Sequence, residues 1–386
     1  MRIAHVAPSS ERVASGVQTA VEELATALGR RGHDVELWHV GDWTPPLDAE
    51  TAERLRSAGV RPRRLTSHRR RGRPLPSIEV PGADAVDLLH LHSVFVPANA
   101  AVGRAWPGPV VLSPHGGYDP VSLRRSVLRK HAYSALYERR LVRRSDTVVA
   151  LTETEAGQVR RFAGAARTAV IPNGVAPGPL GDGTRLRSRL GIPPDARLAV
   201  FVGRLDVRHK GLDRLIRAVA GAPDWRLLIV GPDHRGGREE LLRMVAGSAA
   251  DGRVVLTGEV GPTDLRDVYA AAEVFVLASR WEGLPMSLLE ALAAGVPALV
   301  TPEVDRLVPV GARGAGWVST PDGLGGALQH LATVPDLEWS TRAAAARELA
   351  RNYDWDAVAA AHEQAYDAVL RRWRAGGGRV HRAVPR

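Results

Sequence analysis

Residues 274–290 read VFVLASRWEGLPMSLLE and describe a strand, a loop and a helix in immediate succession. The apolar run Val274–Ala278 is typical of a strand that is buried on both faces of a parallel sheet. Pro285 suits the first turn of the helix, because its missing N–H would be unpaired there. Ligands of open parallel α/β sheets bind at the carboxyl ends of the strands, so we expect a binding site in the loop at residues 280–285.

Two glutamates mark this loop and the helix after it. Glu282 lies in the loop, and Glu290 lies four residues after Met286, on the same helix face and one turn deeper. A carboxylate binds two vicinal hydroxyls well. Taken alone, either glutamate is more typical of an ordinary solvated acid. The backbone around them favours an anion site, because Gly283 permits close approach and the first helical amides are free, those of Leu284, Met286 and Ser287.

A second strand, loop and helix precede this pattern and carry cations. The strand Leu198–Val202 is broken by Gly203, and Arg204 follows it. Lys210 stands just before the next expected helix, so both cations can reach a diphosphate over the strand ends, Arg204 as a planar fork and Lys210 as a point charge. Only two of the 52 basic residues are lysines, Lys130 and Lys210. A surface lysine without a role is the alternative interpretation.

The segments GRLD at 203–206, KG at 210–211 and EGLPMSLLE at 282–290 resemble those of glycosyltransferase family 4. The resemblance covers almost the whole chain. It implies the α/β GT-B fold, in which two Rossmann-like, doubly wound parallel-sheet domains face a central cleft. It also implies a retaining sugar transfer from a nucleotide-diphosphate sugar, without an obligatory metal.

The resemblance assigns roles to residues of the second half. Arg204 and Lys210 would hold the diphosphate beside Gly203, and Glu290 would bind the ribose hydroxyls. Glu282 and the amides of residues 283–287, Pro285 among them, would hold the donor sugar and phosphate. Relatives bind the base mainly through backbone, which corresponds here to Thr257, Gly258 and Val260. The turn into the second domain corresponds to Asn173 and Gly174.

The first half contributes a phosphate loop and a histidine. Gly16 can bring amides near a phosphate, although the family usually has two adjacent glycines where this chain has Ser15 and Gly16. The three-glycine dinucleotide fingerprint is missing, which argues against an NAD enzyme. His115 follows the strand Val110–Ser113, and in the family a histidine here contacts the donor sugar. A purely structural histidine is the alternative. Tyr118 and Asp119 are candidates for contact with the acceptor.

Apolar strands alternate with helical stretches in both halves, as in parallel sheets covered by helices. We predict an acceptor-side domain at 1–175, a linker at 176–195, a nucleotide-sugar domain at 196–352 and a flexible tail at 375–386. By resemblance, a helix at 353–374 crosses back to the first domain. The expected strands are Arg2–Ala7, Val35–His39, Leu88–His92, Val110–Ser113, Thr147–Ala150, Leu198–Val202, Leu227–Val230, Val254–Thr257, Val274–Ala278 and Pro297–Val300.

Composition excludes several classes of protein. A chain of 386 residues without cysteine has room for two cores and has no disulfide, thiolate metal site or thiol nucleophile. The net charge of +10 invites a nucleic-acid interpretation, but no zinc spacing or RNA-binding aromatic motif accompanies it. No run approaches the ~18 apolar residues of a membrane span, and the N-terminus is unlike a signal peptide. We expect a cytoplasmic monomer or weak dimer.

Peripheral contact with an anionic membrane at its inner face is a further expectation. Basic clusters occur at residues 61–73 and 124–144, and basic helices bind anionic lipid. A merely solvated face is the alternative for either cluster.

Two patterns imitate metal sites. His90 and His92 alternate on a strand and therefore share a face, but no third ligand with suitable spacing follows, so we interpret them as packing residues. Asp354 and Asp356 imitate an Asp-x-Asp metal motif but precede a helix, where aspartate commonly caps the first turn. We expect no cofactor and no metal requirement, with the nucleotide sugar as a substrate.

The sequence thus predicts a hexosyltransferase that glycosylates a hydroxyl acceptor in the synthesis of bacterial cell-surface glycans or glycosylated natural products. A nucleotide-sugar epimerase or hydrolase of the same fold is the alternative, and a non-catalytic binding module is a third hypothesis. We predict that Arg204→Ala or Lys210→Ala lowers turnover far more than it perturbs folding.

Overall fold

The computed structural model describes residues 1–6, 16–40, 47, 49–68, 75–82, 84–120, 123, 133–164, 166–176, 178 and 181–376. The chain forms two compact units. Unit 1 comprises Met1–Gly174 together with Trp355–Arg386, and unit 2 comprises Val175–Asp354.

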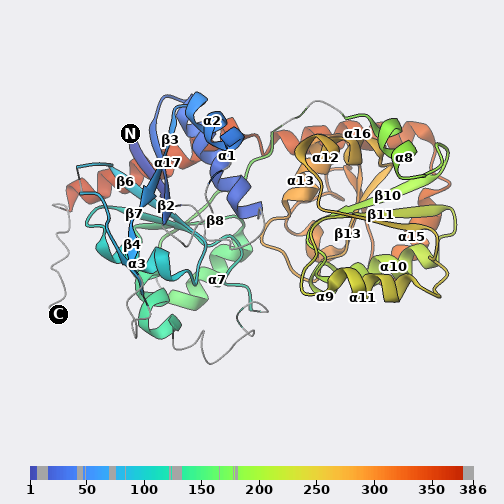
Figure 1. Cartoon of the computed structure of the whole chain (residues 1–386), viewed down its shortest axis with the longest axis horizontal. Helices are drawn as coiled ribbons and strands as arrows, with labels where there is room; N and C mark the ends of the chain where they lie inside the picture. Colours follow the sequence, from blue (N-terminus) through green and yellow to red (C-terminus); the bar gives the residue numbers. More distant parts are fainter. Residues whose placement is uncertain are drawn as a thin grey trace. The chain divides into compact units, whose positions relative to one another are not determined.

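Unit 1 is built on a seven-stranded parallel sheet of order β3-β2-β1-β6-β7-β8-β9 (Figure 1). A two-stranded antiparallel ribbon, β4-β5, is separate from it. The strand order reverses between β1 and β6, and such switch points are where open α/β sheets bind ligands. The strands are β1 (Arg2–Val6), β2 (Asp34–Val40), β3 (Val60–Leu65), β4 (Ser67–His68), β5 (Ser77–Ile78), β6 (Leu88–His92), β7 (Val110–Ser113), β8 (Thr147–Ala150) and β9 (Thr168–Val170).

Helices cover both faces of the unit 1 sheet. One face packs against the first helix and the last helix of the chain, and the other against helices from the middle of unit 1. The last helix is amphipathic, with buried residues spaced three or four apart, which places it in this core although it lies far away in sequence. The helices are α1 (Gly16–Arg30), α2 (Ala49–Ser57), α3 (Pro97–Ala105), the π-helix η2 (Ser134–Glu138), α6 (Arg139–Arg144), α7 (Glu153–Ala163) and α17 (Trp355–Ala375).

Unit 2 has a six-stranded parallel sheet of order β12-β11-β10-β13-β14-β15, again with helices on both faces (Figure 1). Its order reverses between β10 and β13. The elements are α8 (Gly183–Arg189), β10 (Arg197–Val202), α9 (Val207–Lys210), α10 (Leu212–Ala220), β11 (Trp225–Val230), α11 (Gly237–Val245), β12 (Val254–Gly258), α12 (Pro262–Ala271), β13 (Val274–Leu277), α13 (Met286–Ala293), β14 (Ala298–Val300), α14 (Pro302–Asp305), β15 (Gly316–Val318), α15 (Leu324–Leu331) and α16 (Asp336–Arg351).

The fold class predicted from the sequence is confirmed, since both units are parallel α/β sheets with the expected apolar strands at their centres. Five strands were not predicted: β4 and β5 of the ribbon, and β3, β9 and β15, which are edge strands of the two parallel sheets. Strand β3 reads VRPRRL, and its arginines are exposed. The basic cluster predicted at 61–73 begins in this strand, where Arg61 forms ion pairs with Asp34 and Glu36 on the neighbouring strand β2.

The segment predicted to be a linker, 176–195, contains a helix instead. In α8, Leu186 is buried in an apolar cluster with Val268 and Ala271 of α12. Arg187 is also buried, and its guanidinium donates hydrogen bonds to the carbonyl oxygens of Ala196 and Ala271. The Gly- and Pro-rich start of the segment hid this helix from the sequence pattern.

Gly174, at the end of unit 1, packs against the last helix. A Cβ on Gly174 would collide with the indole ring of Trp355, so only glycine fits there. The next residue, Val175, forms an isolated bridge with Asp354. The two points at which the chain passes from one unit to the other therefore lie next to each other.

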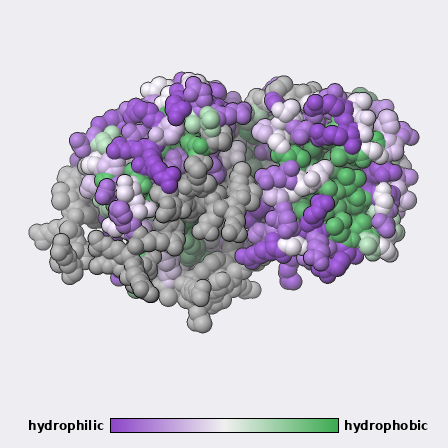
Figure 2. Space-filling model, in the orientation of Figure 1, coloured by the Kyte–Doolittle hydropathy of each residue, from purple (hydrophilic) through white to green (hydrophobic). Residues whose placement is uncertain are grey.

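On the face seen in Figure 2, the coloured surface of both units is mainly hydrophilic, with a band of hydrophobic residues on unit 2. Apolar atoms normally make up more than half of a folded protein's accessible surface, so this band needs no special explanation. No helix in the described part of the chain has the length and apolar composition needed to cross a bilayer. Residues 124–132 of the basic cluster at 124–144 and the tail after residue 376 lie outside the described residues.

Candidate functional site

The candidate site of unit 2 lies at the carboxyl ends of β10 and β13. These strands are hydrogen-bonded neighbours at the point where the strand order reverses, so the loops that follow them leave the same edge of the sheet side by side. The first loop contains Gly203, Arg204 and the short helix α9, and the second contains residues 279–285. The structure therefore brings together the two segments that carry the predicted cations and carboxylates.

Several hydrogen bonds fasten these two loops to each other. Arg280 forms a bidentate ion pair with Asp213, with both N···O distances at 2.8 Å. Its amide donates to the carbonyl oxygen of His209. The ring of His209 stacks on Trp281 at 4.2 Å between centroids, and its Nε2 lies 2.9 Å from the Trp281 carbonyl oxygen. Since a carbonyl oxygen can only accept, Nε2 carries the proton.

Gly211 makes this close approach possible. Its φ is +66°, in the left-handed region, and it both ends α9 and precedes α10. A Cβ at this position would collide with the carbonyl oxygen of Ala278, at the end of β13. Any other residue here would push Lys210 away from the second loop.

Lys210 and Glu282 form a buried ion pair inside the site. Lys210 Nζ lies 2.6 Å from Glu282 Oε1, and the two side chains are 15% and 8% exposed. Ser279 Oγ donates to the same oxygen. Burial raises the pKa of Glu282, but the charge of Lys210, with help from His209 and from both hydrogen bonds, holds this pKa below its ordinary value. Glu282 is therefore ionised at neutral pH, and its Oε2 makes no hydrogen bond to the described residues.

Arg204 differs from every other charged group of the site. It is exposed, and its guanidinium makes no hydrogen bond or ion pair with the residues that the structure describes. Its backbone is fixed nevertheless, because the amide of Leu205 donates to Pro232 and the carbonyl of Arg204 accepts from Asp206. An exposed guanidinium on a fixed backbone, without a partner among the described residues, is available to an anion.

The first turn of α13 supplies unpaired amides beside these charges. The amides of Gly283, Leu284, Met286 and Ser287 donate to none of the described residues, and Pro285 precedes the first helical residue. The positive end of the helix dipole and these N–H groups favour an anion. The structure thus places an exposed guanidinium, a lysine and a helix N-terminus in two adjacent loops.

Glu290 lies on α13 and is held by Tyr269, a residue that no sequence motif indicated. Tyr269 of α12 donates a hydrogen bond of 2.7 Å to Glu290 Oε2. Burial raises the pKa of Glu290, and the tyrosine hydrogen bond opposes this. Tyr269 is 4% exposed and occurs in an ordinary amphipathic helix, so no motif could have indicated it.

Thr257, Gly258 and Val260 lie at the carboxyl end of β12, on the same edge of the sheet. β12 is two strands away from β10, with β11 between them. The carbonyl of Gly258 accepts a hydrogen bond from Gly231 at the end of β11. All three residues are partly exposed.

In unit 1, Gly16 is the exposed first residue of α1, and the loop before it lies outside the described residues. His115 has φ +51°, a conformation that non-glycine residues rarely adopt, and Ser93 and Phe95 after β6 share this property. Such strain clusters at functional sites. Buried Glu155 stabilises the loop by accepting hydrogen bonds from the amides of Gly116 and Leu151.

Tyr118 and Asp119, the candidates for acceptor contact, differ in exposure. Tyr118 is 1% exposed, and its hydroxyl donates to Glu138 at 2.8 Å. Its ring stacks on Phe162 in the core, so the side chain is not available to an acceptor in this structure. Asp119 is partly exposed and lies 3.3 Å from the side-chain amide of Gln158.

Glu138 should make unit 1 less stable as the pH rises. Burial raises its pKa to about 7, against the lowering effect of hydrogen bonds from Tyr118 and Phe95. The folded state then binds a proton that the unfolded state releases near pH 4.5, so stability falls as the pH rises between these values. Relative to Glu138→Gln, we expect the parent to lose about 1 kcal/mol between pH 6 and pH 8. Urea unfolding of both proteins at the two pH values measures this, and parallel pH profiles would contradict it.

Family models match both units. The model described as Glycosyltransferase Family 4 matches residues 14–178, and the model described as Glycosyl transferases group 1 matches residues 196–333. D-inositol 3-phosphate glycosyltransferase of Kineococcus radiotolerans is 30% identical, over 92% of this chain and 90% of its own. Phosphatidyl-myo-inositol mannosyltransferase of Mycolicibacterium smegmatis is 29% identical, over 96% and 94%. HepE of Anabaena, solved with UDP-glucose, superimposes with a TM-score of 0.73 at 19% identity, over 95% of this chain and 100% of its own.

Proposed function

Because this chain belongs to glycosyltransferase family 4, we propose that it transfers a sugar from a nucleotide-diphosphate sugar to a hydroxyl acceptor, with retention of configuration and without a metal ion. Glycosyltransferase activity and a role in glycan biosynthesis follow from the family. One observation supports the proposal of a nucleotide-diphosphate sugar as donor and of transfer without a metal ion. The adjacent loops after β10 and β13 place Arg204, Lys210 and the α13 amides close together.

Sugar transfer builds positive charge at the anomeric carbon and negative charge on the leaving diphosphate. Lys210 and the free amides of α13 are fixed before the reaction begins, and Arg204 stands beside them on a fixed backbone. Such preorganised groups stabilise developing charge without reorganisation. These protein cations and amides supply the charge that a metal ion supplies in other transferases, which supports the proposal that none is needed. Undiminished activity in EDTA is the expected result.

The carboxylates of the site suit hydroxyl groups of the donor. Glu282 is ionised and keeps Oε2 free of described partners, so it can accept from a sugar hydroxyl. Glu290 is oriented by Tyr269 and can accept from two vicinal ribose hydroxyls. By resemblance to the family, His115 contacts the donor sugar, and Asp119 is the remaining candidate for the acceptor.

Tyr269→Phe tests the role of Glu290. We expect the Kd for the nucleoside diphosphate to rise about three- to tenfold, because the carboxylate loses its orienting hydrogen bond, which contributes about 1 kcal/mol. Titration calorimetry measures this change. Tyr118→Phe in unit 1 is the matched control, since it removes an equivalent hydrogen bond from a buried tyrosine to a glutamate. Nucleotide affinity that is equal in both variants would contradict the role of Glu290.

The proposed activity is tested in two steps. Melting temperatures measured with UDP-, GDP-, ADP- and dTDP-sugars identify the donor, because a ligand at 100 times its Kd stabilises the folded state by about 2.7 kcal/mol. The donor is then incubated with hydroxyl acceptors, among them D-inositol 3-phosphate and phosphatidylinositol, and followed by mass spectrometry. Release of nucleoside diphosphate that depends on the acceptor supports transfer, and NMR of the product's anomeric proton tests retention.

Two other outcomes would overturn the proposal. Consumption of the donor without acceptor would indicate an epimerase or hydrolase, an alternative that the transferase relatives do not favour. Binding without any consumption would indicate a non-catalytic module.

A further inference from the structure

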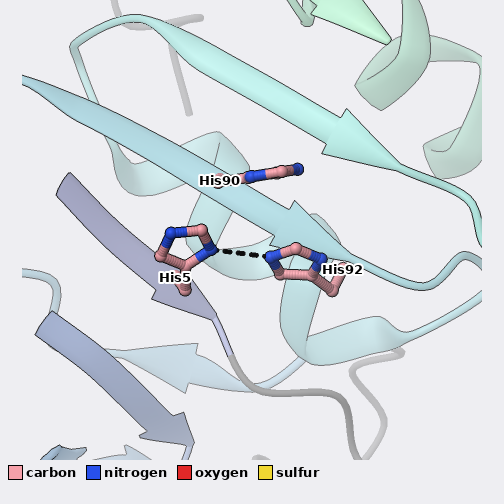
Figure 3. Close-up of side chains that lie close together, drawn as sticks. All are labelled: His5, His90 and His92. Carbon is pink, nitrogen blue, oxygen red and sulfur yellow. Dashed lines mark hydrogen bonds between the residues drawn. The ribbon is translucent and has the colours of Figure 1, made fainter. Parts of the chain in front are cut away.

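Three buried histidines meet on one face of the unit 1 sheet. His5 on β1 pairs in register with His90 on β6, and His92 lies two residues further along β6. Their exposed fractions are 0%, 0% and 1%. Figure 3 shows the three rings beside one another, with His5 and His92 joined by a hydrogen bond. The alternation of His90 and His92 is visible in the sequence, whereas nothing in the sequence links them to His5, which lies more than eighty residues away.

Hydrogen bonds link two of these rings to His115 in a chain. His5 Nδ1 lies 2.9 Å from His92 Nε2, and His92 Nδ1 lies 3.0 Å from His115 Nε2. Burial lowers the pKa values of all three imidazoles, so all are neutral at pH 7. A neutral imidazole carries one proton, so His92 must donate through one nitrogen and accept through the other. Both hydrogen bonds therefore point in the same direction.

The direction of these hydrogen bonds is decided at the two ends of the hydrogen-bond chain, His5 and His115. His5 Nε2 and His115 Nδ1 are both buried and have no hydrogen-bond partner among the described residues. Three rings share three protons, two of which lie in the hydrogen bonds, so one end carries the third. A buried N–H without a partner is rarer in proteins than a partly unsatisfied acceptor. His5 is enclosed in the core, whereas His115 is partly exposed in the loop after β7, so the end of the hydrogen-bond chain at His115 lies nearer the surface, where a ligand binds.

We propose that the chain from His5 through His92 holds His115 as the Nδ1–H tautomer, so that His115 presents a hydrogen-bond donor to the ligand. His5 and His92 are positioning residues in this scheme. That the ligand is a sugar donor rests on the proposed function, while the tautomer itself does not. With its proton on Nδ1 and its Nε2 accepting from His92, His115 has no free lone pair and cannot act as a general base.

A metal site at His5, His90 and His92 is the competing interpretation. One nitrogen from each lies within 4.8 Å of the other two. However, His90 is engaged through both nitrogens, with Tyr366 at 2.7 Å and Ser113 at 2.8 Å. The rings of His90 and His92 also lie 4.0 Å apart and 34° from parallel, so their faces rather than their lone pairs meet. An ion would have to displace several hydrogen bonds.

Long-range ¹H–¹⁵N spectra of protein with ¹⁵N-labelled histidine test the proposal directly, because protonated and unprotonated ring nitrogens resonate far apart. His115→Gln identifies the signals of His115 by their loss. The expected result at pH 7 is a protonated Nδ1 and an unprotonated Nε2 for His115. The reverse pattern, or displacement of the His5, His90 and His92 protons by micromolar Zn²⁺, would overturn the proposal. Neither outcome depends on enzymatic activity, so a failed transfer assay leaves this test intact.

Two substitutions of similar shape at His92 distinguish an effect of the hydrogen-bond chain from an effect of packing alone. The amide of His92→Asn reaches the position of the imidazole Nδ1 and can donate to His115 Nε2, whereas His92→Leu cannot. We expect the Nδ1–H tautomer of His115 to persist in the asparagine variant and to be replaced by the Nε2–H tautomer in the leucine variant. Where transfer is measured, kcat/KM should fall about tenfold or more for leucine alone. The same tautomer in both variants would contradict the proposal.

Discussion

Arg204→Ala is expected to lower kcat/KM for sugar transfer by about 10²- to 10³-fold, the usual loss when one preorganised charge-stabilising group is removed. The free energy of unfolding should change by less than about 0.5 kcal/mol, as for most surface substitutions. The physical reason is that the guanidinium is exposed and unpaired among the described residues. The folded state therefore loses no described hydrogen bond or ion pair, while the leaving diphosphate loses a cation. Steady-state kinetics and urea unfolding measure the two effects.

Arg243→Ala is the matched control for this substitution. Arg243 is exposed in the same unit, on α11, and its ion pair with Glu239 is weak, at 4.0 Å. The substitution Arg243→Ala also removes one positive charge, but at a position away from the strand ends. It should therefore leave kcat/KM nearly unchanged. Equal activity of the Arg204 and Arg243 variants would contradict the assignment of the diphosphate site.

Lys210→Ala tests the diphosphate site less directly than the sequence suggested. The ammonium group of Lys210 is the charged partner of buried Glu282, and removal of one partner from a buried ion pair costs about 3–5 kcal/mol. We therefore expect Lys210→Ala to lose stability as well as activity, unlike Arg204→Ala. The structure revises the sequence-based prediction at this residue.

Unit 1 should unfold in mild acid before unit 2. Burial is the main cause that lowers the pKa values of six histidines in unit 1, to about 3 for His5, to about 4 for three others, and well below 6.5 for two. In unit 2, the structure shows this effect at His209. The six are His5, His39, His90, His92, His115 and His362.

The sign follows from proton uptake by the unfolded chain. An unfolded histidine binds a proton below pH 6.5, whereas these folded ones stay neutral, so the stability they contribute is present above pH 6.5 and is lost as the pH falls. At pH 5 each of these histidines contributes about 2 kcal/mol less to the free energy of unfolding than it does above pH 6.5. The combined loss from six of them is comparable to the 5–15 kcal/mol by which a whole domain is stable. Protonation of Glu138, with its pKa of about 7, returns a few kcal/mol. We expect the unfolding midpoint of unit 1 above pH 5.

Proteolysis at a series of pH values, with fragments identified by mass spectrometry, assigns the transition to a unit. His39→Leu should move the midpoint to lower pH, because both ring nitrogens of His39 are buried without described partners. His330→Leu, at an exposed position in unit 2, is the control. Resistance of unit 1 at pH 4.5, or the same midpoint for parent and His39→Leu, would contradict this account.

The sequence was most informative where one pattern determined both structure and chemistry. Apolar runs such as Val274–Ala278 predicted the central strands, because a strand buried on both faces needs an unbroken hydrophobic run. The loops after those strands were then obvious places for Arg204 and Glu282. Edge strand β3 escaped prediction because its outward side chains are arginines.

Other features depend on contacts between residues far apart in the sequence. Tyr269 and Glu290 come from different helices, and His5 and His92 from different strands. Neither partner has a local signature, so only the folded chain brings them together. The buried environment of Tyr118 was hidden for the same reason, because its partner Glu138 lies twenty residues away.

The central claim is that the loops after β10 and β13 hold the nucleotide diphosphate. Hydrogen-exchange mass spectrometry of the whole chain, with and without the donor that raises the melting temperature most, tests it directly. The account predicts slower exchange in the segments 203–211 and 279–290, most of all at the unpaired amides before and within the first turn of α13. Protection confined to other segments, with these two unchanged at saturating donor, would contradict it.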